Sequence, residues 1–581
     1  MNLVTSKIVG AVDVAAVKPR TLHFLDEEHV LLLVSNTTEG LYGWQRFENS
    51  AAFVLDISTN DLRQLLVGAR GLWPAQTGLG RVVGSSVDGT RLYMPAFAGD
   101  SIARYGLFEV LLNRRVERRI AKGTSNTVDW FVDAAGRPYV EEEFVESKNL
   151  HRIWVHDGND RRLIYEKETD VPDMNPVGLT TDYRQLVFNS TRSGTDRSWD
   201  YHLSLDDGTV TGPFYRRDDA DVATTLTDLN RVVYGVEYSG LMPTYEFADS
   251  ELTERVKDAQ DALNGSAAEL IDWTPTFDRL LFRVSGGWSS GDYVIIGRGY
   301  PKPTLLVRGR PDITSQQVEP TTVMAYRTRD GVTIPALLTY RREAVETGGK
   351  LPLIVLLHGG PAANEHFGFD WIAQYFASRG YAVLQPRLRG STGFGKQLDD
   401  LGKGGWSPEM STDLDDSVQW LIHRGVADPD RVAIIGANSG GYAALAAGAF
   451  SPLYYKCIVS IAGVSDLPRM LQSQKMRYGK YSWSVARWRD RFVAVDDERD
   501  KLEAISPVDH AEDFRAPVLL VHGREDTVVE FDQSERMYNA LKKADKDVTF
   551  VRLESGDHSL SSAQTRLEAL RAVADFIRNK L

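Results

Sequence analysis

Residues 434–442 have the sequence Ile-Ile-Gly-Ala-Asn-Ser-Gly-Gly-Tyr, and this segment is the most informative one in the second half of the chain. Its first residues continue the apolar run 432–435, which is typical of a buried strand, and the alanine-rich stretch 442–450 is typical of a helix. A strand, a turn of small residues and a helix, in this order, are the setting of a nucleophile elbow with the pattern G-x-S-x-G. The segment therefore indicates an α/β protein with a site at this turn.

Outward from this segment, strand patterns alternate with helical patterns from about residue 316 to the end. Residues 323–326 and 333–339 predict a hairpin, and the run 351–357 predicts a buried strand. A helix with apolar residues on one face is predicted after a cap at Ser411 or Thr412. Such alternation predicts a parallel, doubly wound sheet, whose sites lie beyond the carboxyl ends of its strands.

Two further strand ends carry polar residues that acyl transfer uses. An acid, Asp526, follows the predicted strand 518–521, and His558 follows the predicted strand 548–553. The order elbow, acid, histidine along the chain is that of α/β-hydrolases. Each motif alone is a weak signal, but the three together, each after a strand, form a strong one.

The first half of the chain has a different pattern. Short strand-like runs broken by turn residues fill it, and its clearest helical pattern is at 250–263. A turn followed by a polar residue and an apolar pair recurs at residues 91, 137, 185, 231 and 279, in steps of 46, 48, 46 and 48, with an earlier copy at 29. A period in the forties is typical of four-stranded propeller blades, although a stack of unrelated hairpins is an alternative. We expect a β-propeller of six or seven blades over residues 1–315 and an α/β-hydrolase domain over residues 316–581.

These motifs together resemble the prolyl oligopeptidase family of serine peptidases, particularly its acylaminoacyl-peptidase and dipeptidyl-peptidase-like branch. Family members carry a propeller in front of the hydrolase domain, so the resemblance agrees with the two predicted halves. The matching stretches are His358-Gly-Gly-Pro361, Arg389-Gly-Ser-Thr-Gly-Phe-Gly395, Trp406 with Met410 and Asp413, Asp428-Pro-Asp-Arg431, Gly436 to Tyr442, Ser506-Pro507 with His510, His522-Gly-x-x-Asp526 and Gly556-Asp-His558.

The resemblance implies an acyl-enzyme mechanism on short peptides that needs neither a cofactor nor a metal. It gives Asp526 the role of the acid that orients the histidine and His558 the role of the base. Expected oxyanion donors are the backbone N–H of Ser439 and the loop that contains Gly359 and Gly360. Two further histidines of the matching motifs, His358 and His522, are then expected to be structural.

The family's nucleophilic serine falls, without a gap, on Asn438. Asparagine tolerates the positive φ of an elbow, but its carboxamide has no hydroxyl proton for His558 to remove. Alternatively, Ser439 is a displaced nucleophile flanked by Ala437 and Gly441, although one residue of shift turns a helical side chain by about 100°. Three hypotheses stay open: a peptidase whose nucleophile position is vacated, a peptidase that uses Ser439, and an esterase at the same site. A non-catalytic binding or scaffold protein is the rival from another class.

Substrate contacts are predicted in two places. Glu142 and Glu143 lie in a run of three glutamates in a propeller strand, and the resemblance to dipeptidyl peptidases suggests that they hold a free amino terminus. Arg477, Trp483 and Arg487 lie between the elbow and Asp526 and are candidates for lining the pocket. The alternatives are a charged edge strand for the glutamates and ordinary surface packing for the second group.

The amino-acid composition limits which kinds of binding partner we expect for this chain. The 581 residues contain 67 basic and 80 acidic side chains, a net charge of −13, which argues against a nucleic-acid binder. No apolar run is long enough to span a membrane, no signal peptide is visible, and the single cysteine, Cys457, suits a reducing compartment. We therefore expect a cytoplasmic protein with a short peptide as substrate and no nucleic-acid or membrane partner; a homo-oligomer is compatible with this pattern.

Overall fold

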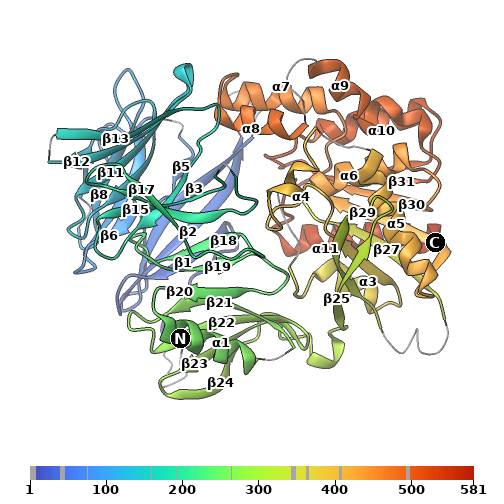
Figure 1. Ribbon diagram of the computed structural model, residues 1–581, viewed down its shortest axis with the longest axis horizontal. Helices are drawn as coiled ribbons and strands as arrows, with labels where there is room; N and C mark the ends of the chain where they lie inside the picture. Colours follow the sequence, from blue (N-terminus) through green and yellow to red (C-terminus); the bar gives the residue numbers. More distant parts are fainter. Residues whose placement is uncertain are drawn as a thin grey trace.

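A computed structural model describes residues 8–39, 46–341, 349–360, 366–404, 408–492 and 498–581, apart from the single positions 75, 115, 159, 193 and 264. Two motif residues named above, Pro361 and Trp406, lie outside the described residues. Figure 1 shows two domains side by side, a mainly β domain coloured blue to green and an α/β domain coloured yellow to red.

The first domain is a propeller of six sheets, each made from consecutive strands of the chain. The first blade is β1 (Lys18–Phe24), β2 (His29–Glu39), β3 (Arg46–Asp56) and β4 (Asp61–Gln64), with β5 (Gly78–Leu79) against β3. The second blade is β6 (Gly84–Ser85), β7 (Arg91–Ala98), β8 (Arg104–Leu111) and β9 (Glu117–Ala121). The third blade is β10 (Thr127–Val132), β11 (Pro138–Val145), β12 (Leu150–Asp157) and β13 (Asp160–Glu168). The fourth blade is β14 (Asn175–Leu179), β15 (Gln185–Ser190), β16 (Trp199–Ser204) and β17 (Val210–Phe214). The fifth blade is β18 (Val222–Thr227), β19 (Val233–Tyr238) and β20 (Thr244–Phe247). The sixth blade is β21 (Ala267–Trp273), β22 (Arg279–Gly286), β23 (Ser289–Gly297) and β24 (Tyr300–Val307).

The repeat in the sequence marks the second strand of every blade. His29, Arg91, Gln185 and Arg279 each begin such a strand, and the copies at 137 and 231 lie one or two residues before β11 and β19. Six copies therefore correspond to six blades, the smaller of the two predicted numbers. In the fifth blade, α1 (Ser250–Asp261) follows three strands, and its buried Leu252 and Val256 pack into the same hydrophobic cluster as blades five and six.

The second domain has an eight-stranded sheet in the order β25-β26-β28-β27-β29-β30-β31-β32. The hairpin of β25 (Thr321–Arg327) and β26 (Thr333–Thr339) joins it antiparallel, and the other strands run parallel. These are β27 (Leu351–Leu357), β28 (Ala382–Pro386), β29 (Ala427–Ala437), β30 (Cys457–Ile461), β31 (Val518–Gly523) and β32 (Val548–Leu553). The expected boundary at residue 315 falls between the end of β24 and the start of β25. Residue 315 remains a proposed boundary between the two domains.

Helices cover both faces of this sheet, because its strands are apolar on both sides. One face packs against α5 (Pro408–His423), α6 (Ser439–Phe450) and α10 (Asp532–Lys543), and the other against α3 (Trp371–Ala377) and α11 (Ala563–Lys580). Within the described residues, the remaining helices are α4 (Lys396–Asp400), α7 (Leu467–Tyr478), α8 (Trp483–Phe492), α9 (Glu498–Ala504) and the short 3-10 helices Glu146–Lys148, Ser315–Gln317 and Pro507–Asp513. Cys457 is fully buried in β30, and this burial raises the pKa of its thiol to about 12.

The predicted cap of one helix is wrong. α5 begins at Pro408, so Ser411 and Thr412 lie inside its first turns. Proline favours the first turn of a helix, since its missing N–H has no intrahelical partner there.

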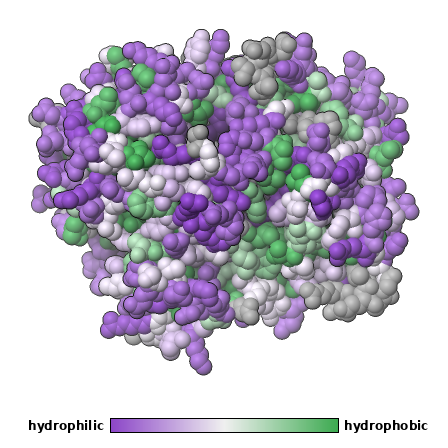
Figure 2. Space-filling model, viewed as in Figure 1, coloured by the Kyte–Doolittle hydropathy of each residue, from purple (hydrophilic) through white to green (hydrophobic). Residues whose placement is uncertain are grey.

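The surface in Figure 2 is hydrophilic over most of both domains, with hydrophobic residues gathered near the junction between them. Among the helices of the described residues, none is long and apolar enough to cross a membrane.

Candidate active site

The elbow of the hydrolase sheet is centred on Asn438. β29 ends at Ala437, α6 begins at Ser439, and Asn438 between them has a φ of 54°. A Cβ atom on Gly436 would lie 1.9 Å from the carbonyl oxygen of Gly440, and one on Gly440 would lie 2.5 Å from the carbonyl oxygens of residues 357 and 358. Gly436 and Gly440, which both exclude a side chain, therefore flank residue 438 at a distance of two, as the elbow pattern requires.

Ser439 has a different place in this turn. It is the first residue of α6, and it lines a cavity of about 70 Å³ together with His358, Leu388 and Tyr442. The positive φ belongs to Asn438, so the backbone turn supports residue 438 rather than Ser439 as the presented position. The N–H groups in the first turn of a helix have no intrahelical acceptor, so the N–H of Ser439 stays a predicted oxyanion donor.

The loop after β27 packs directly against the elbow. A Cβ atom on Gly359 would lie 3.3 Å from both the carbonyl oxygen of Ala437 and the Cβ of Asn438. Gly360, with a φ of 80°, lines the same small cavity as Ser439. The structure thus brings together the three positions named as candidates for the oxyanion site.

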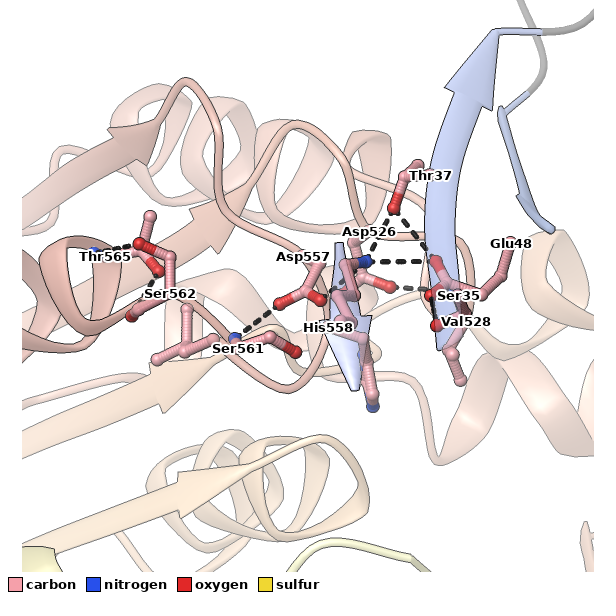
Figure 3. Close-up of polar contacts among 12 residues, drawn as sticks. Ser35, Thr37, Glu48, Asp526, Val528, Asp557, His558, Ser561, Ser562 and Thr565 are labelled. Carbon is pink, nitrogen blue, oxygen red and sulfur yellow. Dashed lines mark hydrogen bonds and ion pairs between the residues drawn. The ribbon is translucent and has the colours of Figure 1, made fainter. Parts of the chain in front are cut away.

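The acid and the histidine form a pair at the ends of the last two strands. The Nδ1 atom of His558 lies 2.7 Å from Oδ2 of Asp526, and the His558 side chain is 17% exposed (Figure 3). The other carboxylate oxygen of Asp526 accepts hydrogen bonds from the backbone N–H groups of Val528 and Val529, at 2.8 and 2.9 Å. These contacts fix the carboxylate and leave Nε2 as the ring nitrogen of His558 that is not bound to Asp526.

A second histidine reaches the same carboxylate. Nε2 of His522 lies 3.2 Å from Oδ2 of Asp526, and its Nδ1 lies 2.8 Å from the hydroxyl of Ser534. Burial by itself raises the pKa of Asp526, but the hydrogen bonds from His522 and His558 lower it to about 2. Asp526 is therefore ionised at neutral pH, and the Nδ1 of His558 must carry the proton that it donates to Asp526.

Backbone hydrogen bonds place the elbow and this pair at one edge of the sheet. The N–H of Asn438 donates to the carbonyl of Ile461 at the end of β30, and the N–H of Ala462 donates to Val521 in β31. Neighbouring strands lie about 4.8 Å apart, so β29 and β31 are about 10 Å apart. Side chains that extend from these two strand ends can meet over β30, as the parallel order of the sheet requires.

The two predicted glutamates do not converge on one site. Glu142 and Glu143 are neighbours in β11, so their side chains point to opposite faces. Glu142 accepts a hydrogen bond from buried His151, at 2.8 Å, while Glu143 accepts from Trp154 and Arg161, at 2.6 and 3.2 Å. Both carboxylates are buried and already bound to neighbouring side chains of their own blade. They therefore form neither the predicted site for a peptide's amino terminus nor a solvated edge strand.

Of the three candidates between the elbow and Asp526, Arg477 lies near the site. It donates to the carbonyl of Thr527, in the acid loop, and lines a cavity of about 1360 Å³ between the two domains. Arg487 stacks on Trp483 at 5.3 Å, within α8. Among the described residues, the lining of this cavity includes Arg477 and neither of those two side chains.

A propeller in front of an α/β sheet, with an elbow and an acid–histidine pair at its strand ends, places the second domain in the α/β-hydrolase fold class. The profile of the prolyl oligopeptidase family (Peptidase_S9) matches residues 367–581. The chain therefore carries a domain of the prolyl oligopeptidase family, whose members are serine peptidases.

Curated relatives support this assignment. Dipeptidyl aminopeptidase BIII of Pseudoxanthomonas mexicana is 29% identical over 71% of this chain, and the acylamino-acid-releasing enzyme of Arabidopsis thaliana is 28% identical over 42% of it. The chain spans 60% of the length of the first relative and 32% of the second.

Solved structures agree with the fold of the whole chain. A puromycin-hydrolysing peptidase of Mycobacterium tuberculosis is similar with a TM-score of 0.68 at 18% identity, covering 98% of this chain and 95% of its own. An acylaminoacyl peptidase of Pyrococcus horikoshii gives a TM-score of 0.69 at 16% identity, covering 98% and 96%. The two-domain arrangement is therefore common to these proteins.

Proposed function

We propose that this chain binds short peptides at the strand ends of its hydrolase domain and that Asn438 occupies the position of the nucleophile, so that turnover is severely reduced. The observation that carries the proposal is the contrast at one sheet edge. Asn438 has the backbone conformation of an elbow, while Asp526 and His558 keep a 2.7 Å contact. An ordered acid–base pair beside a residue without an acidic proton is what a serine peptidase without its serine would have.

The chemistry follows from these groups. In the Asn438→Ser variant, Nε2 of His558 would take the hydroxyl proton while the oxygen attacks the peptide carbonyl. Asp526 would stabilise the imidazolium, and backbone N–H groups near Ser439 and Gly359 would hold the oxyanion. His558 would then give the proton to the leaving amine, and water would release the acyl group. With Asn438 in place, the first of these steps has no nucleophile.

Short peptides are the proposed substrates because a large cavity lies beside the acid loop. The cavity of about 1360 Å³ reaches Thr527 and Val528 in the acid loop and is lined from the propeller by Trp73, Phe97 and Tyr105. Its aromatic wall suits a peptide with apolar side chains. The names of the relatives suggest hydrolysis near a peptide's amino terminus, free or acylated.

Activity of Asn438→Ser on short chromogenic peptides is the decisive test. We expect kcat/KM to rise at least about 10³-fold over the parent chain, since losing a triad nucleophile leaves only the catalysis of the oxyanion hole and binding. A fluorophosphonate probe, followed by peptide mapping, should label residue 438 of this variant and leave the parent chain unlabelled. No gain in hydrolysis of any short peptide would contradict the proposal.

The same experiment separates the other hypotheses. Labelling of Ser439 in the parent chain, abolished by Ser439→Ala, would establish a displaced nucleophile. Hydrolysis of acyl esters but not peptides by Asn438→Ser would indicate an esterase. Peptide binding with no hydrolysis in any variant would favour a scaffold protein. A cytoplasmic location, the absence of nucleic-acid partners and a homo-oligomer remain proposals that rest on composition and on the single cysteine.

A further inference from the structure

The first propeller blade contacts the loop that carries His558. Nζ of Lys18, in β1, lies 2.7 Å from Oδ2 of Asp557, the residue that precedes His558. Both side chains are largely buried, with 16% and 11% of their surfaces exposed. This ion pair joins residues that are 539 positions apart in the sequence.

Lys18 is held in place by its own domain. Its ammonium also donates to the hydroxyl of Thr37 at 2.7 Å and to Oε2 of Glu48 at 3.0 Å. An ammonium has three N–H donors, so these two bonds and the one to Asp557 use all of them. Glu48 is fixed in turn by the hydroxyl of Ser35 and by Arg20, and Figure 3 shows Ser35, Thr37 and Glu48 on propeller strands facing the histidine loop.

Asp557 transmits this contact to the loop. While Oδ2 meets Lys18, Oδ1 accepts the backbone N–H of Ser561 at 2.7 Å, and the Asp557 carbonyl accepts the N–H of Leu560 at 3.1 Å. Burial raises the pKa of Asp557, but Lys18 and Ser561 lower it overall, so the carboxylate is charged at neutral pH. The turn 557–561 is therefore closed around a charge that the propeller neutralises.

The same blade also contacts the acid loop. Nη1 of Arg46, in β3, donates to the carbonyl of Arg524 at 2.5 Å, two residues before Asp526. One blade thus contacts both loops of the acid–histidine pair, at Asp557 and at Arg524.

We propose that Lys18 is a positioning residue, through which the first propeller blade holds the loop 555–562 so that His558 faces Asp526. Without Lys18, Asp557 would keep a buried charge with one fewer partner and would turn toward water, carrying the loop with it. The effect on the histidine loop is independent of catalysis; only its consequence for turnover rests on the proposed function.

Hydrogen exchange of residues 555–562 tests this in the chain as it exists. We expect Lys18→Met and Asp557→Asn to increase exchange in this loop at least several-fold. Arg20→Met is the matched control, because Arg20 lies on the same strand and binds the same Glu48, while its described contacts are with Ser35 and Glu48 and do not include Asp557. Lys18→Arg, which keeps a charged donor, should restore much of the protection.

Kinetics in the Asn438→Ser background give the second readout. There, Lys18→Met should lower kcat between 10- and 100-fold with little change in KM, since displacing a catalytic group by about 1 Å costs up to 10²-fold and Lys18 is absent from the described lining of the substrate cavity. Equal exchange in Lys18→Met, Arg20→Met and the parent chain would overturn the proposal. If Asn438→Ser is inactive, the exchange data still decide this inference, so the two failures are distinguishable.

Discussion

The elbow and the acid–histidine pair lie at the same edge of one sheet, yet they differ in which features of a catalytic site they have. The elbow keeps its geometry, with a φ of 54° at Asn438 and no space for a side chain at Gly436 or Gly440. The pair keeps its chemistry as well, with a 2.7 Å contact between His558 and Asp526. Under the proposed function, packing preserves the backbone of this turn, whereas its reactivity depends on one side-chain atom at residue 438.

The largest effect should come from removing the acid once the nucleophile is restored. In the Asn438→Ser background, Asp526→Asn should lower kcat by about 10⁴, because an amide in place of the carboxylate favours the wrong tautomer of His558. The measurement is steady-state hydrolysis of the best chromogenic peptide. Glu525→Gln, a change at the neighbouring acid, should stay within about twofold. Equal losses in both variants would mean that Asp526 has no special role.

The packing of the elbow can be tested next. Gly440→Ala should destabilise the protein by about 3 kcal/mol, because overpacking of this size forces the backbone to move and the new methyl group would meet two carbonyl oxygens at 2.5 Å. Urea unfolding measures the effect. Gly78→Ala, where nothing lies within 4 Å of the added methyl group, is the control and should change the free energy of unfolding by less than about 0.5 kcal/mol. A tolerated Gly440→Ala would show that the elbow is held less tightly than its contacts imply.

A smaller effect concerns the pH dependence of stability. The pKa of Asp526 falls from 3.8 to about 2 on folding, so its contribution is complete above about pH 4 and is lost as the pH falls through 2. A shift of this size corresponds to about 2 kcal/mol. Unfolding free energies of the parent chain and of Asp526→Asn, measured from pH 5 to pH 2, should therefore converge by about that amount. A constant difference across this range would mean that Asp526 is not stabilised by its histidine partners.

The fold was largely predictable because its signals are local. The hairpin at 333–339, the strand 351–357 and the repeat of the propeller follow from apolar patterns and turns that lie within a few dozen residues. The start of α5 was not predicted correctly, because Ser411 and Thr412 resemble a helix cap. The actual first residue is Pro408, three residues before Ser411.

The site was predictable where each motif follows its own strand, as Asp526 and His558 do. The opposite faces of Glu142 and Glu143 could have been predicted as well, since adjacent side chains alternate in a strand. The contact between Lys18 and Asp557 could not have been predicted from the sequence. No local sequence pattern identifies two residues that only the docking of two domains brings together.

The lone cysteine has a practical consequence for measuring how the two domains move. Because Cys457 is inaccessible and its thiol has a pKa of about 12, it stays protonated and unreactive toward thiol-specific dyes at neutral pH. Cysteines introduced at the exposed positions Val87, in the propeller, and Leu453, in the hydrolase domain, can thus carry a fluorophore pair on an otherwise native chain. Energy transfer between them would report the separation of the domains directly.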